Sequence, residues 1–422
     1  MADAVITENK FIKCGLCGLV GHPLGHSFSP QIHSLIGGYE YRLFDLQPEQ
    51  LADFFGARNF SAVNVTIPYK TDVMKYCDRI SREAQIIGSV NTVVKEKDGT
   101  LSGYNTDYFG FKSMVEKAGV NVRGKKAVVL GSGGSSRTVV SVLRDLGASE
   151  TVVISRSGPD NYLNISKHSD ARIIVNTTPC GMYPRNGEKA LSLSVFTDPE
   201  GVCDIVYNPE KTALLLEAEK LRIPYAGGLY MLVAQAVKAA EFFFDTVIDG
   251  KKIDGIYRKI NFGMRNITLV GMPGCGKSTV GRFIASLTGK KFFDCDDYIT
   301  EKTGATPEEI IRSQGEAGFR SIETEALAEL TRMSGAVISC GGGAVTVPEN
   351  IPLLRQNGKV VYLERDIAEL ETKGRPLSEG GREVLVRMLE KRDPLYREAS
   401  DFSVRVCQTP ELTAKKILEY LD

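Results

Sequence analysis

A glycine-rich segment in the C-terminal third carries the strongest chemical signal in the chain. Residues 271–279 read GMPGCGKST and follow the spacing G-x-x-x-x-G-K-[ST], after the apolar run NITLV and before the helical pattern TVGRFIASL. Glycines let backbone N–H groups converge on phosphate oxygens, and a helix start adds the positive end of its dipole. Lys277 would meet the β- and γ-phosphates, and the Ser278 hydroxyl would ligate Mg²⁺. The expected ATP-binding residues here are Gly271, Gly274, Gly276, Lys277, Ser278 and Thr279.

Charged residues downstream of this loop could complete a site for phosphoryl transfer. Asp294 and Asp296 stand two apart at the end of an expected strand, where alternate residues share one face. One carboxylate could then serve the metal while the other holds a substrate hydroxyl. A second glycine cluster, Gly341–Gly343, follows another apolar strand. Three separated arginines could clamp a carboxylate and the transferring phosphoryl group; they are Arg320, Arg375 and Arg397. Taken singly, each residue also fits a solvated turn or a surface charge.

Another glycine turn lies near the middle of the chain. The segment AVVLGSGGSSR combines a strand, a turn and the start of a helix, which is the context of a dinucleotide-binding site. The residues expected to bind the cofactor there are Gly131, Gly133, Gly134 and Ser135. NAD enzymes usually carry an acid at the end of the next strand, whereas this chain has Arg156, which favours the 2′-phosphate of NADP(H). Asp160 lies close enough to keep NAD as an alternative.

The N-terminal part contains two charged residues suited to proton transfer. Lys70 ends the run NVTIPYK and Asp107 ends GYNTD. A partly buried lysine paired with a carboxylate could protonate a carbonyl oxygen as a hydride arrives. For either residue alone, an ordinary surface charge is the alternative. His22 and His26 flank the same region, and a structural role is favoured for both.

An α/β fold is expected to position these residues, because strand and helix patterns alternate through most of the chain. Strand candidates occur at CGLCGLVG, YRLFDL and SAVNVTI, and later at TVVISRS, RIIVNTT and GVCDIVY. The run VVKEKDGTLSGY predicts a hairpin with Asp98 and Gly99 at its turn. The segment KKIDGIYRKINFGMR is polar and short of periodic apolar faces, so we predict that it is a linker.

These patterns divide the chain into domains. We predict a substrate-binding domain at residues 11–109, completed by helices in residues 236–260, and a Rossmann-like NADP-binding domain at residues 110–235. The linker would occupy residues 251–265. A P-loop domain with a central parallel sheet would occupy residues 266–422.

Composition restricts the partners of this chain. Lys+Arg and Asp+Glu both number 52, and no basic stripe appears, so nucleic acid is not an expected partner. The most apolar run includes Gln235, Lys238 and Glu241, which argues against a membrane span. Nine scattered cysteines and a polar N-terminus indicate a reducing cytoplasm. Small-molecule anions are the expected partners, and the oligomeric state stays open.

The C-terminal block resembles shikimate kinase from Ile267 to the end of the chain. The matching segments are GMPGCGKSTVGR, FFDCDDYI, GFRSIE, SCGGGAV, RPL and DPLYRE. Residues that the resemblance implies for shikimate binding are Asp296, Arg320, Gly341, Gly342, Gly343 and Arg397. It further implies that Asp294 supports Mg²⁺ through water and that Arg375 comes from a lid over ATP. Lys277, Asp296 and Arg375 would be catalytic, with Asp296 orienting the attacking hydroxyl.

The N-terminal segments resemble shikimate dehydrogenase over roughly Cys14 to Ile260. The matching segments are GHPLGHSFSPQIH, AVNVTIPYK, GSVNTV, GYNTD, GSGGSSR, VNTTPCGM and GGLYMLVAQA, in the same order as in the family. Residues that the resemblance implies for substrate binding are Ser27, Ser29, Thr66, Asn91, Asp107, Tyr207 and Gln235. Lys70 and Asp107 would form the catalytic pair.

The two resemblances meet at one metabolite, which predicts a bifunctional enzyme. The N-terminal part would reduce 3-dehydroshikimate to shikimate with NADPH, and the C-terminal part would phosphorylate shikimate with ATP and Mg²⁺. One alternative is a quinate/NAD dehydrogenase joined to another small-molecule P-loop kinase. A non-catalytic shikimate sensor is the other alternative.

Overall fold

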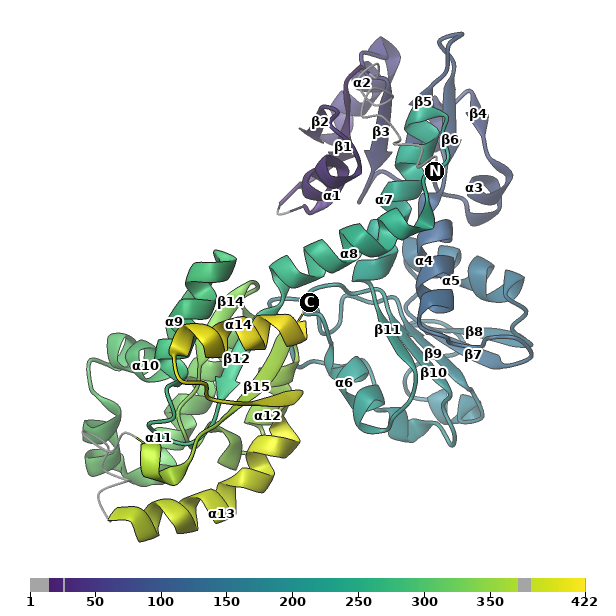
Figure 1. Ribbon diagram of the computed structural model, residues 1–422. Coiled ribbons are helices and arrows are strands. Elements are labelled where there is room, and N and C mark those ends of the chain that lie inside the picture. The colour runs from purple at the N-terminus through teal and green to yellow at the C-terminus, as the bar shows by residue number, and fades with distance from the viewer. Residues whose placement is uncertain (1–14, 26, 371–380, 422) are drawn as a thin grey trace, which may run out of the picture. The chain divides into compact units, whose positions relative to one another are not determined.

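The computed structural model describes residues 15–25, 27–370 and 381–421, and the chain divides into two units (Figure 1). The first unit holds residues up to 180 together with 189–207 and 217–260. The second holds residues from 261 onward together with 181–188 and 208–216. Each unit is described by itself below.

The first unit begins with a six-stranded mixed sheet in the order β2-β1-β3-β5-β6-β4. Its strands are β1 Cys17–Gly21, β2 Tyr41–Asp45, β3 Ala62–Val65, β4 Arg79–Ile80, β5 Thr92–Lys95 and β6 Leu101–Tyr104. The helices of this lobe are α1 Ser29–Ile36, α2 Leu51–Ala57 and α3 Arg82–Ile87. The predicted hairpin is confirmed, since β5 and β6 pair antiparallel and Gly99 at their turn has a φ of +83°. Both of its strands pack apolar side chains into the lobe's core.

A five-stranded parallel sheet in the order β11-β10-β9-β7-β8 follows in the same unit. Its strands are β7 Lys126–Leu130, β8 Glu150–Ile154, β9 Ile173–Asn176, β10 Gly201–Asp204 and β11 Tyr225–Gly227. The associated helices are α4 Thr106–Lys117, α5 Gly134–Asp145 and α6 Ala213–Lys220. The central strands β7 and β9 are almost wholly buried apolar runs, as parallel strands covered on both faces require.

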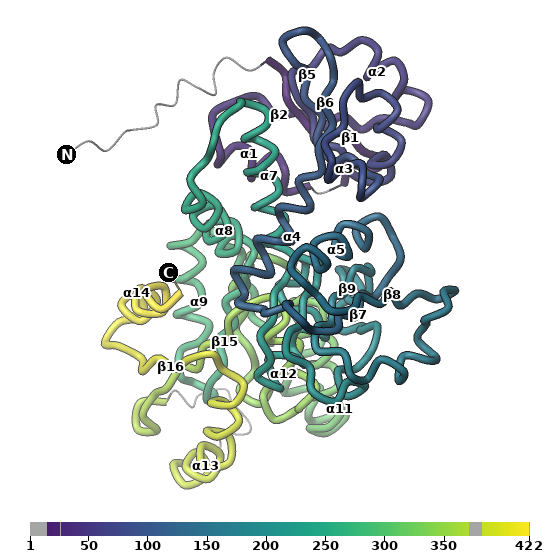
Figure 2. The backbone as a smooth tube through the Cα atoms, turned by 90° about the vertical axis from the view of Figure 1, so that its right-hand side faces the viewer, coloured from purple at the N-terminus to yellow at the C-terminus, as the bar shows by residue number. Residues whose placement is uncertain are grey.

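Two long helices connect the sheets of the first unit. Helix α7, Leu229–Phe244, lies beside α4 in both views (Figures 1 and 2). The close approach is possible at Gly110, because a Cβ there would lie 2.6 Å from the carbonyl oxygen of Met231. Leu232 and Gln235 on α7 therefore face the region where the N-terminus of α4 meets the first sheet.

The segment predicted as a linker without an apolar face is an amphipathic helix. Residues Gly250–Met264 form α8, and the side chains at positions 253, 256, 260 and 264 are buried. This spacing of three to four residues is the helical period, which the surrounding Lys and Arg residues obscured in the sequence. Asp254 ties α8 to its neighbours by accepting bonds from Lys117 at 3.0 Å and from the Tyr230 hydroxyl at 3.0 Å.

The second unit is built on a five-stranded parallel sheet in the order β13-β14-β12-β15-β16. Its strands are β12 Asn266–Val270, β13 Lys291–Asp294, β14 Ala336–Ser339, β15 Gly358–Glu364 and β16 Phe402–Arg405. The helices are α9 Lys277–Thr288, α10 Cys295–Thr303, α11 Pro307–Arg332, α12 Asn350–Arg355, α13 Gly381–Ala399 and α14 Pro410–Leu421. This parallel sheet confirms the α/β expectation for the C-terminal block. Among the described residues, no helix is long and apolar enough to cross a bilayer.

Candidate active sites

A cavity of about 340 Å³ opens in the first unit where the two lobes meet α7. Polar residues from β3, α4, α7 and several loops converge on it. The predicted residues among its lining are Ser27, Ser29, Thr66, Lys70, Asn91, Asp107, Ser135, Tyr207 and Gln235. The structure therefore brings all the dehydrogenase residues proposed for substrate and proton transfer to one place.

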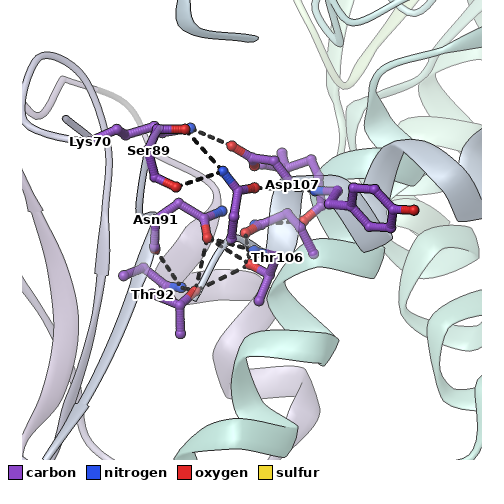
Figure 3. Close-up of polar contacts among 11 residues, drawn as sticks. Lys70, Ser89, Asn91, Thr92, Thr106 and Asp107 are labelled. Carbon is purple, nitrogen blue, oxygen red and sulfur yellow. Dashed lines mark hydrogen bonds and ion pairs between the residues drawn. The ribbon is translucent and has the colours of Figure 1, made fainter. Parts of the chain in front are cut away.

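Lys70 and Asp107 form an ion pair at the edge of this cavity (Figure 3). The lysine Nζ lies 2.6 Å from Oδ2 of Asp107, and their side chains are 27% and 14% exposed. Asp107 stands in the first turn of α4, where the positive end of the helix dipole stabilises a carboxylate. The side chain of Asn105 caps the same helix by accepting a bond from the backbone N–H of Tyr108. The pair is thus held by a helix terminus and is open to a ligand.

Asn64 is a cavity residue that the sequence reasoning missed. It lies in the buried strand β3, where it accepts a bond from the Tyr41 hydroxyl at 2.8 Å and donates to Thr92 at 3.2 Å. The signal was present in the sequence, because a polar amide in the run AVNVTI interrupts an otherwise apolar strand. Buried polar groups need partners, so such an interruption often marks a site.

His22 pairs with Asp45, and the structural role favoured for this histidine stays a prediction. Its Nδ1 lies 2.6 Å from Oδ1 of Asp45, whose other carboxylate oxygen accepts the backbone N–H of Leu24. The hydrogen bond from His22 lowers the pKa of Asp45, and the bond from Leu24 adds to the effect. This arrangement holds the loop that carries Leu24 at the cavity. His26 lies outside the described residues.

The predicted dinucleotide turn leads from β7 into α5. Gly131 adopts a φ of +101°, Gly133 is the N-cap of α5 and Gly134 is its first residue. A Cβ at Gly133 or Gly134 would meet no other atom within 4 Å, so the backbone of this turn is open to a ligand. Arg156 is exposed after β8. Asp160 is the residue on which the alternative of NAD as cofactor depends. Its Oδ1 lies 2.9 Å from Nε2 of His168.

The phosphate-binding loop of the second unit has the backbone that the motif requires. Gly271, Gly274 and Gly276 have φ values of +148°, +79° and +99°, a region that favours glycine. Lys277 is the first residue of α9, and its Nζ donates to the carbonyl oxygens of Gly271 at 2.9 Å and Met272 at 3.0 Å. The amino group thus lies inside the loop, while Thr279 is exposed on the helix.

Ser278 and Asp294 provide oxygen atoms beside the loop. The Ser278 hydroxyl lies 2.5 Å from Oδ2 of Asp294 and 3.3 Å from the Ser339 hydroxyl. A hydroxyl and a carboxylate are hard donors, and Mg²⁺ in phosphate sites takes only one or two such protein ligands. The residues present therefore fit Mg²⁺. Among the described residues, no group of three or more His, Cys, Asp and Glu side chains could hold a metal by itself.

The prediction that Asp294 and Asp296 share one face of a strand is wrong. Asp294 ends β13, but Asp296 lies in the first turn of α10, so the two do not alternate along one strand. Asp294 is instead the N-cap of α10 and accepts the backbone N–H of Asp296 at 3.1 Å. Asp296 still reaches the second glycine cluster, since its Oδ1 would lie 3.4 Å from a Cβ at Gly341.

Arg320 lies beneath that glycine cluster and is held by two glutamates. It pairs with Glu323 at 2.6 Å and with Glu316 at 3.0 Å, and the Glu323 side chain is fully buried. Burial raises the pKa of Glu323, and Arg320 opposes that rise. A Cβ at Gly343 would lie 1.9 Å from Nη2 of Arg320, and one at Gly341 would lie 2.2 Å from Oε1 of Glu323. A side chain at either position would therefore require Arg320 or Glu323 to move.

Arg397 is not brought to the glycine cluster. Its exposed guanidinium pairs with Glu364 at 2.9 Å and Asp393 at 2.8 Å. Arg392, on the same helix, contacts the glycine cluster instead, because its guanidinium donates to the carbonyl oxygen of Gly342 at 3.1 Å. The helical period explains this difference, because Arg392 stands four residues before the buried Tyr396 and shares its face, whereas Arg397 is turned away. Arg375 lies outside the described residues.

Comparison with known proteins identifies the first unit. Residues 19–93 match the family model "Shikimate dehydrogenase substrate binding domain". A shikimate dehydrogenase (NADP(+)) of Clostridium perfringens is 38% identical over 267 residues, which is 58% of this chain and 98% of that protein. The chain belongs to the shikimate dehydrogenase family. In this shikimate dehydrogenase, Lys70 lies within the residues matched by the substrate-binding model.

Solved structures agree with this assignment. A chorismate mutase/shikimate 5-dehydrogenase fusion protein from Clostridium acetobutylicum is 36% identical, with a TM-score of 0.56, and the match covers 58% of this chain and 97% of that one. The shikimate 5-dehydrogenase from Thermus thermophilus, solved with NADP(H) and shikimate, is 30% identical with a TM-score of 0.53 and coverages of 58% and 98%.

Residues 273–422 match the family model "Shikimate kinase". A shikimate kinase domain thus follows the shikimate dehydrogenase in one polypeptide. The protein is a bifunctional enzyme of the shikimate pathway.

Proposed function

We propose that the first unit reduces 3-dehydroshikimate to shikimate with NADPH, and that Lys70 and Asp107 perform the proton transfer. NADPH, when bound, supplies the hydride that reaches the carbonyl carbon. Lys70 then donates a proton to the carbonyl oxygen, which becomes a hydroxyl. Asp107 at 2.6 Å keeps the ammonium group oriented toward the cavity and stabilises its charge before the transfer. The ion pair at a cavity of substrate size is the single observation that carries this assignment.

The remaining cavity residues would bind and orient the substrate. Ser27 and Ser29 offer hydroxyl donors to its carboxylate, and the N–H of Ser29 already donates to Oγ of Ser27 at 3.2 Å. Thr66, Asn91 and Gln235 would bind the ring oxygens. Burial raises the pKa of Tyr207, so its hydroxyl stays protonated at neutral pH and can donate a hydrogen bond.

NADPH is the cofactor that the local charges favour. Arg156 is exposed at the end of β8 and can meet a 2′-phosphate. Oδ1 of Asp160 lies 2.9 Å from Nε2 of His168, so one of its two carboxylate oxygens already has a partner within the protein. A clear preference for NAD and quinate in cofactor and substrate titrations would instead support the quinate dehydrogenase alternative.

For the second unit, we propose phosphorylation of the shikimate 3-hydroxyl by ATP. The loop Gly271–Thr279 would hold the phosphates, and Lys277 would neutralise charge on the transferring group. Ser278 would ligate Mg²⁺ and Asp294 would support it through water, and the metal would supply further charge neutralisation on the phosphate oxygens. Asp296, beside Gly341, would orient the attacking hydroxyl and accept its proton.

The glycine cluster and its arginines would form the shikimate side of this kinase site. Arg320 lies under Gly341–Gly343 in a buried pair with Glu323, and Arg392 reaches the same turn. We propose that Arg392, rather than Arg397, joins Arg320 in binding the shikimate carboxylate. The catalytic role of Arg375 at a lid stays a prediction.

The domain boundaries stay predictions as well. We retain three functional domains. The substrate-binding domain comprises residues 11–109 together with 236–260, the NADP-binding domain residues 110–235, and the kinase domain residues 266–422. Residues 251–265 stay the connection between the two enzymes. Expression of residues 1–265 alone tests this division, because a correct boundary leaves NADP-dependent shikimate oxidation intact. Loss of soluble, active protein on this cut would place the boundary elsewhere.

A coupled assay tests both activities together. Purified protein receives 3-dehydroshikimate, NADPH and ATP with Mg²⁺, and the loss of NADPH and the formation of shikimate 3-phosphate are followed. Formation of the phosphate ester only when all components are present is the expected result. NADPH consumption without phosphorylation would refute the kinase assignment, and the absence of both would refute the bifunctional assignment and leave the sensor alternative.

A further inference from the structure

Two buried threonine hydroxyls link the three amide side chains of the dehydrogenase cavity. Thr92 and Thr106 are 0% and 1% exposed, and their Oγ1 atoms lie 3.2 Å apart (Figure 3). Around them stand Asn64 of β3, Asn91 directly before β5 and Gln235 of α7. All three amides line the cavity, whereas neither threonine does.

A backbone group determines the orientation of each amide. Oδ1 of Asn91 lies 2.7 Å from the backbone N–H of Thr106, which can only donate. Nδ2 of Asn64 lies 3.4 Å from the carbonyl oxygen of Asn91. Nε2 of Gln235 lies 2.9 Å from the carbonyl oxygen of Leu232. Both carbonyl oxygens can only accept a hydrogen bond. These contacts set which end of each amide is oxygen and which is nitrogen.

With the amides set, the two hydroxyl protons can supply a donor to the amide oxygens of both Asn91 and Gln235. Thr92 receives a bond from Asn64 at 3.2 Å and donates to Oδ1 of Asn91 at 3.1 Å. The Thr106 proton then goes to Oε1 of Gln235 at 3.3 Å, because a hydroxyl has a single proton and Asn91 already has its donors. Thr106 is therefore the side-chain donor that holds the oxygen of Gln235 away from the cavity.

We propose that Thr106 is a positioning residue for substrate specificity that acts through Gln235. By holding Oε1, it turns the second N–H of Gln235 toward the substrate, so that the site offers a donor to a ring oxygen rather than an acceptor. The close approach of α4 and α7 at Gly110 places the two side chains within reach. This inference rests on the proposed dehydrogenase function of the cavity.

Replacement of Thr106 by Val and by Ser tests the role of its hydroxyl. Thr106→Val keeps the shape but removes the proton donor, so the amide of Gln235 is no longer held. We expect the KM for shikimate to rise roughly three- to tenfold, with kcat within about twofold and the KM for NADP unchanged. Thr106→Ser should restore the wild-type KM. An unchanged KM in the Val variant, or an equal rise in the Ser variant, would overturn the proposal.

A double-mutant cycle with Gln235→Leu shows whether Thr106 acts through this amide. In the Gln235→Leu background, adding Thr106→Val should change the KM for shikimate no further, because the group that Thr106 positions is gone. Additive effects, or a parallel rise in the KM for NADP, would mean a general structural role and contradict the proposal.

Calorimetric titration with shikimate separates this inference from the proposed function. All proteins in this titration carry Arg392→Ala, so that the proposed shikimate site of the kinase contributes little, and the protein with this change alone serves as the wild-type reference. If the wild-type protein binds shikimate without turnover, the proposed reaction fails, and the same variants are compared by Kd. A Kd that rises in Thr106→Val and recovers in Thr106→Ser still supports the positioning role. A wild-type protein that does not bind shikimate would overturn both.

Discussion

At the scale of single residues, both sites depend on charged side chains that a neighbour holds in place. Asp107 is held by the first turn of α4 and holds Lys70 in turn. Arg320 is held by the buried carboxylate of Glu323. A side chain fixed by such a partner loses less conformational entropy when a ligand arrives, so its interaction with the ligand is worth more.

Arg392 and Arg397 provide a matched pair of substitutions on one helix. We expect Arg392→Ala to raise the KM of the kinase for shikimate about ten- to a hundredfold, because a charged hydrogen bond to the carboxylate is lost. Arg397→Ala should change it by less than about twofold, since its pairs with Glu364 and Asp393 are exposed. Initial-rate kinetics with shikimate varied at saturating ATP measure both. If Arg397→Ala instead raised the KM and Arg392→Ala did not, Arg397 would be the residue that binds the shikimate carboxylate.

At the scale of secondary-structure elements, close packing decides where the catalytic groups lie. In the first unit, α1 lies on the sheet through His33, whose ring stacks on Tyr41 at 3.9 Å and on Phe243 at 5.8 Å. In the second unit, the glycine turn after β14 lies directly on the side chains of Arg320 and Glu323. Both contacts are close, so a newly charged group at His33 or a new side chain in the glycine turn would disturb the packing.

Because His33 is buried, the stability of the first unit should depend on pH. Burial lowers the pKa of His33 to about 3, so the folded state binds its proton only far below the unfolded-state pKa of 6.5. Its contribution is therefore present above pH 6.5 and is lost as the pH falls, by about 1 kcal/mol between pH 7.5 and 5.5. Urea inactivation of the dehydrogenase at both pH values measures this loss. His33→Phe keeps an aromatic ring and should lose less stability over the same range; an equal loss would exclude His33.

Substitution in the glycine turn should disable the kinase alone. In Gly343→Ala the new Cβ would lie 1.9 Å from Nη2 of Arg320, so the arginine must leave its position. We expect kinase kcat/KM for shikimate to fall at least about tenfold, since a misplaced group near the chemistry carries such a cost. Gly263→Ala is the control, because its Cβ would meet nothing within 4 Å. Near-normal kinase activity in Gly343→Ala would show that the turn tolerates a side chain.

At the scale of the whole molecule, the two sites draw on separate sets of residues. All residues that line the dehydrogenase cavity belong to the first unit. The described residues of the phosphate loop and of the glycine cluster belong to the second unit. The two chemistries also differ in kind, since one transfers a hydride and a proton and the other a phosphoryl group. Each activity should therefore be removable without the other.

Two lysine substitutions should separate the activities. Lys70→Ala should lower dehydrogenase kcat about a thousandfold, because the proton donor is lost, and leave phosphorylation of added shikimate unchanged. Lys277→Ala should abolish phosphorylation and leave NADP-dependent oxidation of shikimate unchanged. Lys75→Ala and Lys415→Ala are matched controls on exposed lysines of each unit. Parallel loss of both activities in either variant would instead indicate that the units depend on each other.

Local motifs in the sequence were enough to predict the reaction classes. The spacing of Gly271, Gly276 and Lys277 requires a particular backbone path after a strand, and the structure has that path. The alternation of apolar runs similarly predicted the parallel sheets, since strands covered on both faces must be apolar throughout. These features depend on residues close together in the chain, so the order of residue types suffices.

Only the tertiary structure decided which distant side chains meet. Arg392 and Arg397 are similar in sequence context, but one lies on the buried face of α13 and the other does not. The apolar stripe of α8 was hidden among basic residues until its packing was visible. Thr106 reaches Gln235 only because α4 and α7 approach closely at Gly110. Such contacts join residues far apart in the chain, and their geometry follows from how whole elements pack rather than from local preference.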